Sequence, residues 1–450
     1  MIPLRTLALL AALAALAGCA LPEGERRTIS SVRFGDTSRP IGVARSNADL
    51  AEDFLDLTFA LESGETLKGM LRYERPVRVY MQSPALQGYR RDLDALLARL
   101  RTEAGIDIAE TGSAAQAQIV IEAVPESQIA RFFPDAACFI VPGVTNWRDF
   151  LRQRPEARTR WSTQKTLTHA VIFLPPDTTP QDVRDCLNEE ITQALGPAND
   201  LYRLPDSIWN DDNFHSSATS FDMLILRTLY QPEFRSGMTR AEAAAEVQQV
   251  LDRVNPQGRG VPSQKRAPES RAWAGEIETA LSQQASREER LRSAVSATRI
   301  ALEMDPPDQR LGVSLLTLGR LSLRRDPVAA AQYFTDAYRL FQQEFGDMDI
   351  RTAQAAVHVS ALALGMEQYD LSIELADRHV PAAIAGQNAI LVAGLLSIKA
   401  EALADLGKTD SAEEARLDSL RWARYGFGDN SGELAREQAQ NTAMLTPQPK

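Results

Sequence analysis

Residues 181–230 contain the feature that most constrains the fold: a helical stretch, a glycine turn, an irregular polar loop and a second helical stretch. Apolar residues in the first stretch recur at the three- and four-residue spacing of a helix with one buried face. They are Val183, Leu187, Ile191, Ala194 and Leu195. Gly196-Pro197 ends this helix, and Thr219 to Asp222 has the spacing of a capping box that starts the next. The stretch therefore predicts two helices held around a loop.

The N-terminus has the features of a bacterial lipoprotein signal. A short basic start precedes an apolar run at 7–17, which is too short to span a bilayer comfortably. The run ends in Leu16-Ala17-Gly18-Cys19, which resembles a lipobox and implies cleavage before Cys19 and acylation of that cysteine. The alternative is a plain signal peptide with a chance cysteine. Ala20, rather than Asp, follows Cys19, so we expect a lipid anchor on the periplasmic face of the outer membrane.

Charge and length narrow the partners and the number of domains. The formal net charge of −11 argues against nucleic acid, because phosphate binding needs a basic face. A chain of 450 residues is too long for one ordinary domain, and the Pro- and Gly-rich stretch at 256–270 marks the main boundary. We expect a signal peptide at 1–18, a tether at 19–45, a first domain at 46–255, a linker at 256–270, helical repeats at 271–435 and a disordered tail at 436–450.

Residues 46–255 mix strand and helix patterns. Strands are predicted at 76–81, 106–109, 118–123, 138–142 and 169–174. A short helix is predicted within 49–64, and further helices at 89–104, 180–195 and 236–255. This mixture indicates an α+β domain. Its two cysteines, Cys138 and Cys186, either form a disulfide in an oxidising compartment or remain two buried thiols.

From residue 272 onward the sequence is helical, alanine-rich and repetitive. Small residues recur twelve positions apart, as Gly319 and Ala331, Ser360 and Ser372, and Ala400 and Ala412, and successive units are 41 and 40 residues long. Two helices can cross closely at such residues. The pattern resembles the tetratricopeptide family, and the resemblance implies stacked helix pairs with a concave groove for a protein partner. An ordinary helical bundle is the alternative.

The helix in the opening stretch also resembles a known catalytic motif. Residues 189–196, Glu-Glu-Ile-Thr-Gln-Ala-Leu-Gly, have the spacing of the zinc-protease motif H-E-x-x-H-x-x-G without its histidines. Alignment on Gly196 puts Glu189 and Gln193 at the histidine positions, Glu190 at the general-base position and Asn199 at the third ligand of metzincins. Residues 206–210 resemble the tight turn beneath the metal, and the order of strands and helices resembles that of zincins. The resemblance implies a zincin-like (metzincin-like) fold.

The residues at these positions argue against a metal. One carboxylate and two amides make a poor zinc site, so no metal, cofactor or catalytic residue is expected and the four positions are vestigial. His169 lies on a strand, and His215 is the one conceivable stray ligand. A calcium site is a weaker alternative to an acid-rich solvated loop; its candidates are Asp200, Asp206, Asp211 and Asp212. For Glu190 we expect a raised pKa and hydrogen bonds to loop amides near Asn210.

Two longer segments are similar to an uncharacterised alphaproteobacterial lipoprotein family, a domain of unknown function. They are RDCLNEEITQALGPANDLYRLPDSIWNDD and FDMLILRTLYQPEFRSGM, and the similarity covers about residues 47–257. It implies a zincin-like fold, an envelope location and a bridge between Cys138 and Cys186. It also implies a histidine where this chain has Asn188, a departure that argues further against a metal.

Together these features favour a lipid-anchored envelope protein with an inactive zincin-like domain and helical repeats that bind another protein. One alternative is an active hydrolase of peptides or cell-wall material that uses Glu190, and another is a structural spacer. The residues expected to shape the turn and the cap are Gly196, Ser207, Trp209, Asn210, Thr219 and Asp222.

Overall fold

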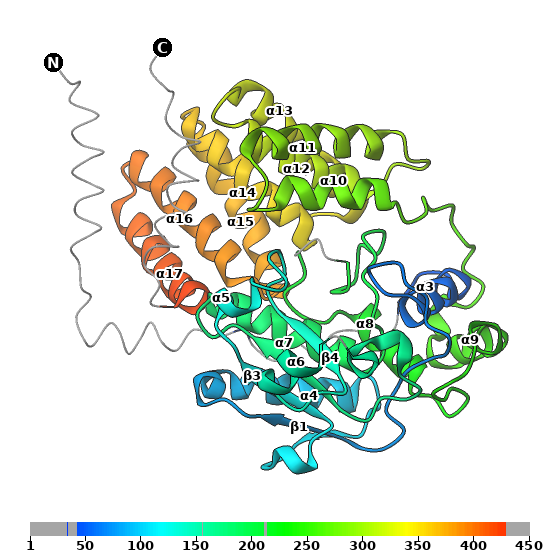
Figure 1. Ribbon diagram of the computed structural model, residues 1–450. Coiled ribbons are helices and arrows are strands. Elements are labelled where there is room, and N and C mark those ends of the chain that lie inside the picture. Colours follow the sequence, from blue (N-terminus) through cyan, green and yellow to red (C-terminus); the bar gives the residue numbers. More distant parts are fainter. Residues whose placement is uncertain (1–33, 35–42, 155, 211–213, 429–450) are drawn as a thin grey trace.

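The computed structural model describes residues 34, 43–154, 156–210 and 214–428. The described residues do not include the segment expected to be a signal peptide, Cys19, most of the expected tether, Asp211, Asp212 or residues 436–450. Figure 1 shows a region of strands and helices on one side and an arc of helices across it. Among the described helices, none combines the length and the apolar character needed to cross a membrane.

A five-stranded sheet forms the centre of the first region. The strands are β1 (Val77–Met81), β2 (Ile108–Glu110), β3 (Ile119–Ala123), β4 (Phe139–Pro142) and β5 (Ala170–Leu174), in the order β2-β1-β3-β5-β4. Four strands are parallel, and β4 runs antiparallel to β5 at one edge. Parallel strands need crossover connections, so the region is α/β rather than the α+β domain predicted from the sequence. The prediction of a mixed region followed by an all-helical one is confirmed.

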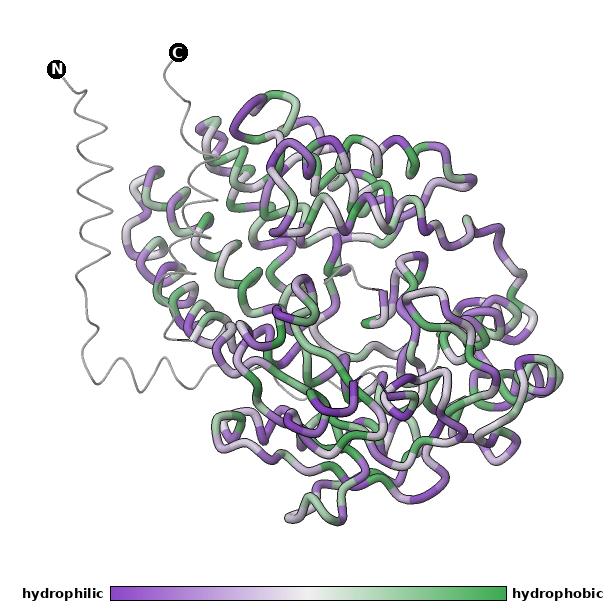
Figure 2. The backbone as a smooth tube through the Cα atoms, in the orientation of Figure 1, coloured by the Kyte–Doolittle hydropathy of each residue, from purple (hydrophilic) through white to green (hydrophobic). Residues whose placement is uncertain are grey.

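Helices cover both faces of the sheet. The main core lies between the sheet and α3 (Asn47–Phe59), α4 (Arg90–Thr102), α7 (Pro180–Ala194), α8 (Ser220–Leu229) and α9 (Arg240–Val254). A smaller core on the other face includes Phe150 and Phe173 and lies under α5 (Glu126–Ile129) and α6 (Trp147–Gln153). Burial on both faces explains why β5 is an unbroken apolar run, and Figure 2 shows green, hydrophobic stretches of backbone within this region.

The second region consists of helix hairpins over its described residues. Its helices are α10 (Arg271–Leu281), α11 (Arg287–Leu302), α12 (Gln309–Ser322), α13 (Pro327–Phe345), α14 (Ile350–Gly365), α15 (Tyr369–Ala385), α16 (Ala389–Asp405) and α17 (Thr409–Phe427). The first helices of three successive hairpins begin at residues 309, 350 and 389, so these units are 41 and 39 residues long. Each helix packs against the next along the chain.

Most of the small residues singled out in the sequence lie where helices cross. Ser360 and Ser372 are fully buried, and each hydroxyl donates to the backbone oxygen of the other residue, at 2.8 and 3.0 Å. Gly319 lies against the ring of Phe334, so a Cβ there would come within 2.7 Å of Cε1. Ala400 and Ala412 share a small apolar cluster, whereas Ala331 is half-buried.

Candidate functional site

The α7 helix carries the aligned motif positions between the sheet and a cavity. Thr179 and Asp182 form a capping box at its start, with Pro180 at the first helical position. The apolar face of α7 lies in the main core, where Leu187 and Ile191 are buried. Glu189, Glu190 and Gln193 lie in the wall of the cavity.

Glu190 is a buried acid whose hydrogen bonding is incomplete. Its side chain is 5% exposed, and its Oε2 atom has no hydrogen-bond partner among the described residues. Burial, together with the nearby negative charges of Asp200 and Glu62, raises the pKa of the carboxyl to about 8. The hydrogen bonds expected from Glu190 to loop amides near Asn210 are not found among the described residues, and the Glu190 side chain lines the cavity.

Gln193 and Asn199 make contacts that do not converge on a metal. Gln193 Nε2 donates to both carboxylate oxygens of Asp200, each at 2.9 Å. Asn199 Nδ2 donates to the backbone oxygen of Asp56 at 2.9 Å. Within the described ranges, no group of three His, Cys, Asp or Glu side chains lies close enough to hold one metal ion. The residues present therefore do not fit the zinc ion that the motif spacing implies.

The two histidines of this region lie against backbone oxygens. His169 Nδ1 is 3.2 Å from the oxygen of Ala117, and burial lowers the pKa of this imidazole. His215 Nε2 is 2.9 Å from the oxygen of Pro205. The structure does not bring either ring together with Glu190 as part of a ligand set.

The loop after α7 is held by the side chains that the sequence assigned to a turn and a cap. Asp222 accepts from Ser207 Oγ at 2.6 Å and from the backbone N–H groups of Ile208 and Thr219, at 3.1 and 2.6 Å. Asp222 therefore makes the loop contacts expected of Glu190. Its pKa is raised to about 6 by burial, which these hydrogen bonds oppose.

Three further contacts fix this loop to α7 and to the core. The indole Nε1 of Trp209 donates to Thr192 Oγ1 on α7 at 3.0 Å, and Asn210 Nδ2 donates to the backbone oxygen of Leu204 at 3.0 Å. Gly196 has φ 140°, and a Cβ there would lie 2.5 Å from the backbone oxygen of Leu71. Only glycine satisfies both constraints without a backbone shift.

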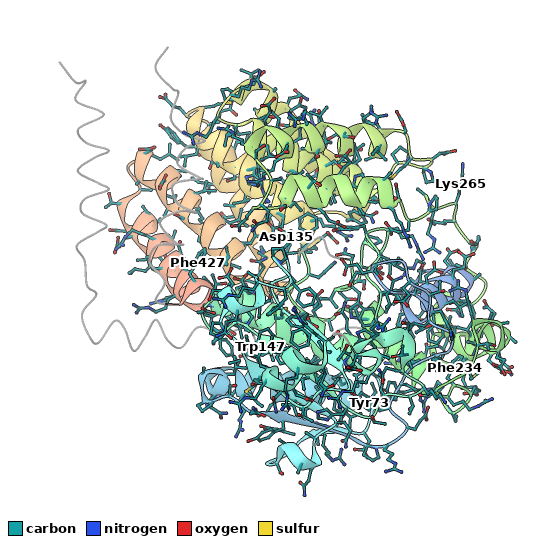
Figure 3. All side chains as sticks on the ribbon, in the orientation of Figure 1. Tyr73, Asp135, Trp147, Phe234, Lys265 and Phe427 are labelled. Atoms are coloured by element: carbon teal, nitrogen blue, oxygen red, sulfur yellow. A yellow bond between two sulfur atoms is a disulfide. The ribbon has the colours of Figure 1, made fainter. Side chains whose placement is uncertain are left out.

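A cavity of about 2110 Å³ lies between the two regions. Residues 138–141, at and before β4, form part of its wall, together with α7 and the helices α10 and α11. The described lining contains nine acidic residues, Glu62, Glu126, Asp135, Asp182, Glu189, Glu190, Asp200, Glu278 and Glu289, against the three arginines 154, 160 and 292. Figure 3 places Asp135 between the regions, where it accepts from Ser282 Oγ of the helical region at 2.8 Å.

The expected disulfide is confirmed and lies at this cavity. Cys138 and Cys186 are bridged, which fastens the start of β4 to the middle of α7. Cys138 is itself a lining residue, so the bridge holds two walls of the cavity together.

Residues 47–249 match the model of a family described as a protein of unknown function (DUF2927). The match runs from the start of α3 into α9, so it covers the α/β region and stops before the helical one. No curated protein and no solved structure matches this chain. The domain of unknown function expected from the sequence is therefore found where it was expected, with the wall of the cavity that α7 and β4 provide inside it.

Apolar residues of the loop between α7 and α8 pack into the helical region, which sequence reasoning missed. Tyr202 lies 5.0 Å from Trp273, and Phe214 lies 5.9 Å from Phe341, between ring centroids. These four residues share one apolar cluster. The loop looked polar in the sequence, and the signal that could have revealed this packing is the isolated aromatic residues Tyr202 and Phe214.

The first helices of three successive hairpins, α12, α14 and α16, also contact the α/β region through their N-terminal ends. Gln309 at the start of α12 donates to the backbone oxygen of Tyr202 at 2.8 Å, and Arg351 near the start of α14 donates to that of Pro205. At the start of α16, the backbone N–H of Ala389 donates to Gln181 of α7 at 3.1 Å. The helical region is thus fixed over α7 and its loop.

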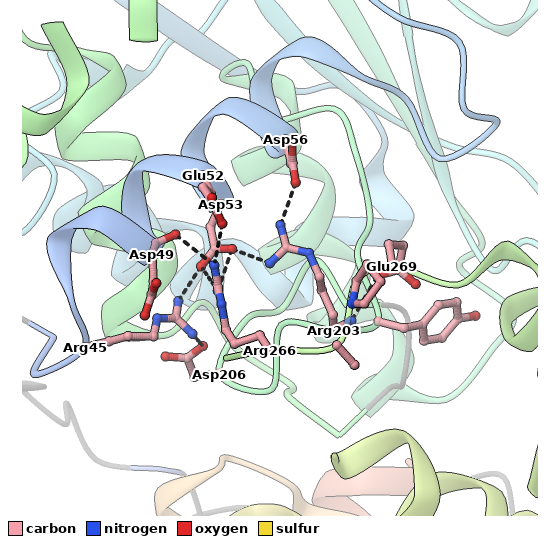
Figure 4. Close-up of polar contacts among 12 residues, drawn as sticks. Arg45, Asp49, Glu52, Asp53, Asp56, Arg203, Asp206, Arg266 and Glu269 are labelled. Carbon is pink, nitrogen blue, oxygen red and sulfur yellow. Dashed lines mark hydrogen bonds and ion pairs between the residues drawn. The ribbon is translucent and has the colours of Figure 1, made fainter. Parts of the chain in front are cut away.

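A cluster of ion pairs joins the predicted linker to α3 (Figure 4). Asp53 is fully buried and pairs with Arg45 at 3.1 Å, with Arg266 of the linker at 2.8 Å, and with Arg203 of the loop after α7. These arginines lower the pKa of Asp53 against the opposing effect of burial. Asp206, one of the residues considered for calcium, pairs with Arg45 at 3.1 Å in the same cluster.

Proposed function

We propose that this protein is a lipid-anchored binding protein of the cell envelope, in which an inactive zincin-like domain and tetratricopeptide-like repeats together hold a protein partner. The observation that carries the proposal is the cavity of about 2110 Å³ with walls from both regions. Its α7 positions, Glu189, Glu190 and Gln193, do not belong to any metal-ligand group within the described residues. A large site with a rigid wall and no ligand set favours binding over metal-dependent hydrolysis.

The zincin-like assignment rests on where α7 lies. It follows β5 directly, and both β4 and β5 pack against it. The turn that resembles the one beneath the metal is joined to α7 through Trp209 and Thr192. The spacing of the motif and the position of α7 in the fold are therefore both consistent with a zincin-like domain, whereas the side chains at the ligand positions do not fit zinc.

An extended polypeptide suits this cavity better than a small ligand. Small-molecule pockets have volumes of roughly 300–1,000 Å³, well below the volume of this cavity. The wall includes β4, which ends the sheet and is paired with β5 alone among the described strands. Aromatic side chains contribute further apolar surface, including Phe133, Phe139 and Trp161. Edge strands and apolar pockets are common elements of peptide recognition.

The helical region contributes through its first hairpin. The cavity wall includes Glu278 of α10, Ser282 directly after α10, and Arg292 of α11. The tetratricopeptide-like assignment is supported by units of 41 and 39 residues with buried small residues at the crossings. The ends of α12, α14 and α16 hold the chain's own α/β region, so the partner is proposed to bind at the hairpin α10–α11.

Metal analysis of the purified full-length protein tests the inactive domain. We expect no stoichiometric zinc after gel filtration, because Gln193 and Asn199 are engaged with Asp200 and the backbone of Asp56. One tightly held zinc per chain, lost together with a measurable peptidase activity on chelation, would overturn the proposal.

The lipid anchor is tested separately at Cys19. When cells that express the protein are grown with radiolabelled palmitate, the protein should carry the label and should be found in the outer-membrane fraction. The variant Cys19→Ser should lose both the label and the membrane association. If this variant still carried the label, Cys19 would not be the acylated residue.

An active hydrolase remains the second candidate because of one observation. The raised pKa of Glu190, about 8, gives this buried residue the protonation state of a general acid at neutral pH. Peptide and peptidoglycan substrates, incubated with the wild type and with Glu190→Gln, distinguish the two functions. Turnover that this substitution abolishes while stability is retained would establish hydrolysis.

A further inference from the structure

The wall of the cavity contains a buried carboxyl group, one oxygen of which lacks a hydrogen-bond donor among the described residues. Glu190 is 5% exposed, and its Oε2 has no hydrogen-bond partner among the described residues, although Glu190 lines the cavity. A buried polar atom left without a hydrogen bond costs free energy, so a ligand that supplies a donor there is favoured. The geometry of the wall thus points to a ligand group that donates hydrogen bonds.

The surrounding charges indicate that this group is cationic. Asp200 and Glu62 lie close enough to Glu190 to act on it electrostatically, and both line the same cavity. Acidic residues outnumber basic ones by nine to three over the described lining. Opposite charges attract more strongly at a buried site than in water, so this wall disfavours anionic ligands and stabilises a cation.

An organic cation fits the arrangement better than a metal ion. The carboxylates are not gathered closely enough, within the described residues, to hold one metal ion. An ammonium group has three donors and a guanidinium group has five, so either can reach separated carboxylates. Asp200 already accepts two hydrogen bonds from Gln193, which leaves Glu190 as the group that most needs a donor.

We propose that the cavity receives a lysine or arginine side chain of an extended polypeptide, whose cation binds to Glu190 with Asp200 and Glu62 beside it. The inference rests on the proposed binding function and adds the chemical class of the partner. The volume of the cavity and the strand β4 in its wall favour a polypeptide over a free amine. The aromatic side chains Phe133, Phe139 and Trp161 supply apolar surface for the rest of the segment.

Calorimetric titration of the full-length protein with two synthetic peptide pools tests this inference. The pools differ only at the central position, which is lysine in one and norleucine in the other, so that they match in length and apolar surface. We expect the lysine pool to bind at least about tenfold more tightly. Glu190→Gln should remove that preference and leave the affinity for the norleucine pool unchanged. The matched control is Glu414→Gln, which makes the same chemical change at an exposed glutamate outside the described lining of the cavity and should preserve the preference.

Proton release gives a second readout that a purely structural role of Glu190 would not produce. Because burial holds the pKa of Glu190 at about 8, its carboxyl is protonated at neutral pH and must ionise when a cation binds. Titrations in buffers of different ionisation enthalpy should show close to one proton released per lysine peptide by the wild type. They should show none for Glu190→Gln.

The outcomes separate the inference from the function on which it rests. Equal binding of both pools would refute recognition of a cationic side chain, but it would still support a cavity that binds peptides. Binding of neither pool would refute a basic polypeptide as the ligand. The proposal of an inactive domain would then still be decided by the metal analysis. Spermidine that binds as tightly as the lysine pool, with the same loss in Glu190→Gln, would overturn the polypeptide as the source of the cation.

Discussion

Replacement of Glu190 by glutamine should stabilise the protein, and the gain should grow with pH. The carboxyl of Glu190 has a pKa of about 8 in the folded state against an ordinary value of 4.5. Between these values the folded state keeps a proton that the unfolded state has lost. Folding stability therefore falls as the pH rises through this interval. Glutamine has nearly the same shape and does not ionise, so it avoids this loss.

The size of the effect follows from the shift. The two pKa values differ by 3.5 units, and at 1.36 kcal/mol per unit the wild type loses about 5 kcal/mol between the two pKa values. The stability advantage of Glu190→Gln should be small near pH 4 and approach this value near pH 9. Asp185, whose pKa burial raises to about 8, also lowers stability with pH, but it is present in both proteins and cancels in the comparison.

Urea unfolding followed by tryptophan fluorescence, at a series of pH values, measures this difference directly. The free energy of unfolding of the variant minus that of the wild type should rise steadily above the ordinary pKa of glutamate. A difference that does not change with pH would refute the reasoning, because it would mean that Glu190 ionises equally in the folded and unfolded states. A variant less stable than the wild type at high pH would show that the charged form makes a contact that stabilises the fold.

Three further perturbations test the parts that surround the cavity. Reduction of the bridge between Cys138 and Cys186, 48 residues apart, should lower the free energy of unfolding by roughly 4 kcal/mol, measured by urea unfolding with and without dithiothreitol. Asp53→Asn removes the buried carboxylate that three arginines share and leaves each of them only its second, more exposed partner, so it should cost roughly 3 kcal/mol, seen as a lower urea midpoint. Trp209→Phe keeps an aromatic ring but removes the indole N–H that donates to Thr192 and leaves a void at a fully buried position, so it should cost at least about 1–3 kcal/mol, seen in the same experiment.

Local features of the candidate site could be predicted from the sequence. The helix α7, its end at Gly196 and the capping box of Thr219 and Asp222 all depend on residues a few positions apart. Such spacings act through hydrogen bonds that form within one turn of chain, so the residues alone specify them. The unit length of the helical region was predictable for a related reason, because small residues are needed wherever two helices cross.

The contacts of Glu190 could not be predicted, because they depend on residues far apart in the sequence. The raised pKa expected for this residue agrees with its burial, but the sequence does not specify the direction in which its carboxylate points. Glu62 comes from the segment after α3, and the cavity is closed by α10 and α11. The parallel arrangement of the sheet was missed for the same reason, since strand partners are fixed by crossover connections rather than by the pattern within each strand.

The loop after α7 has a role that does not require a metal. Hydrogen bonds of Ser207 and Trp209 give it a fixed shape, and Tyr202 and Phe214 on that loop pack into the helical region. Aromatic contacts of this kind add about 0.5–1.5 kcal/mol each beyond the area that they bury. The loop that contains the turn resembling the base of a metal site is thus a surface against which the helical region packs. Since α10 and α11 complete the wall of the cavity, the shape of this loop also helps to determine the shape of the cavity.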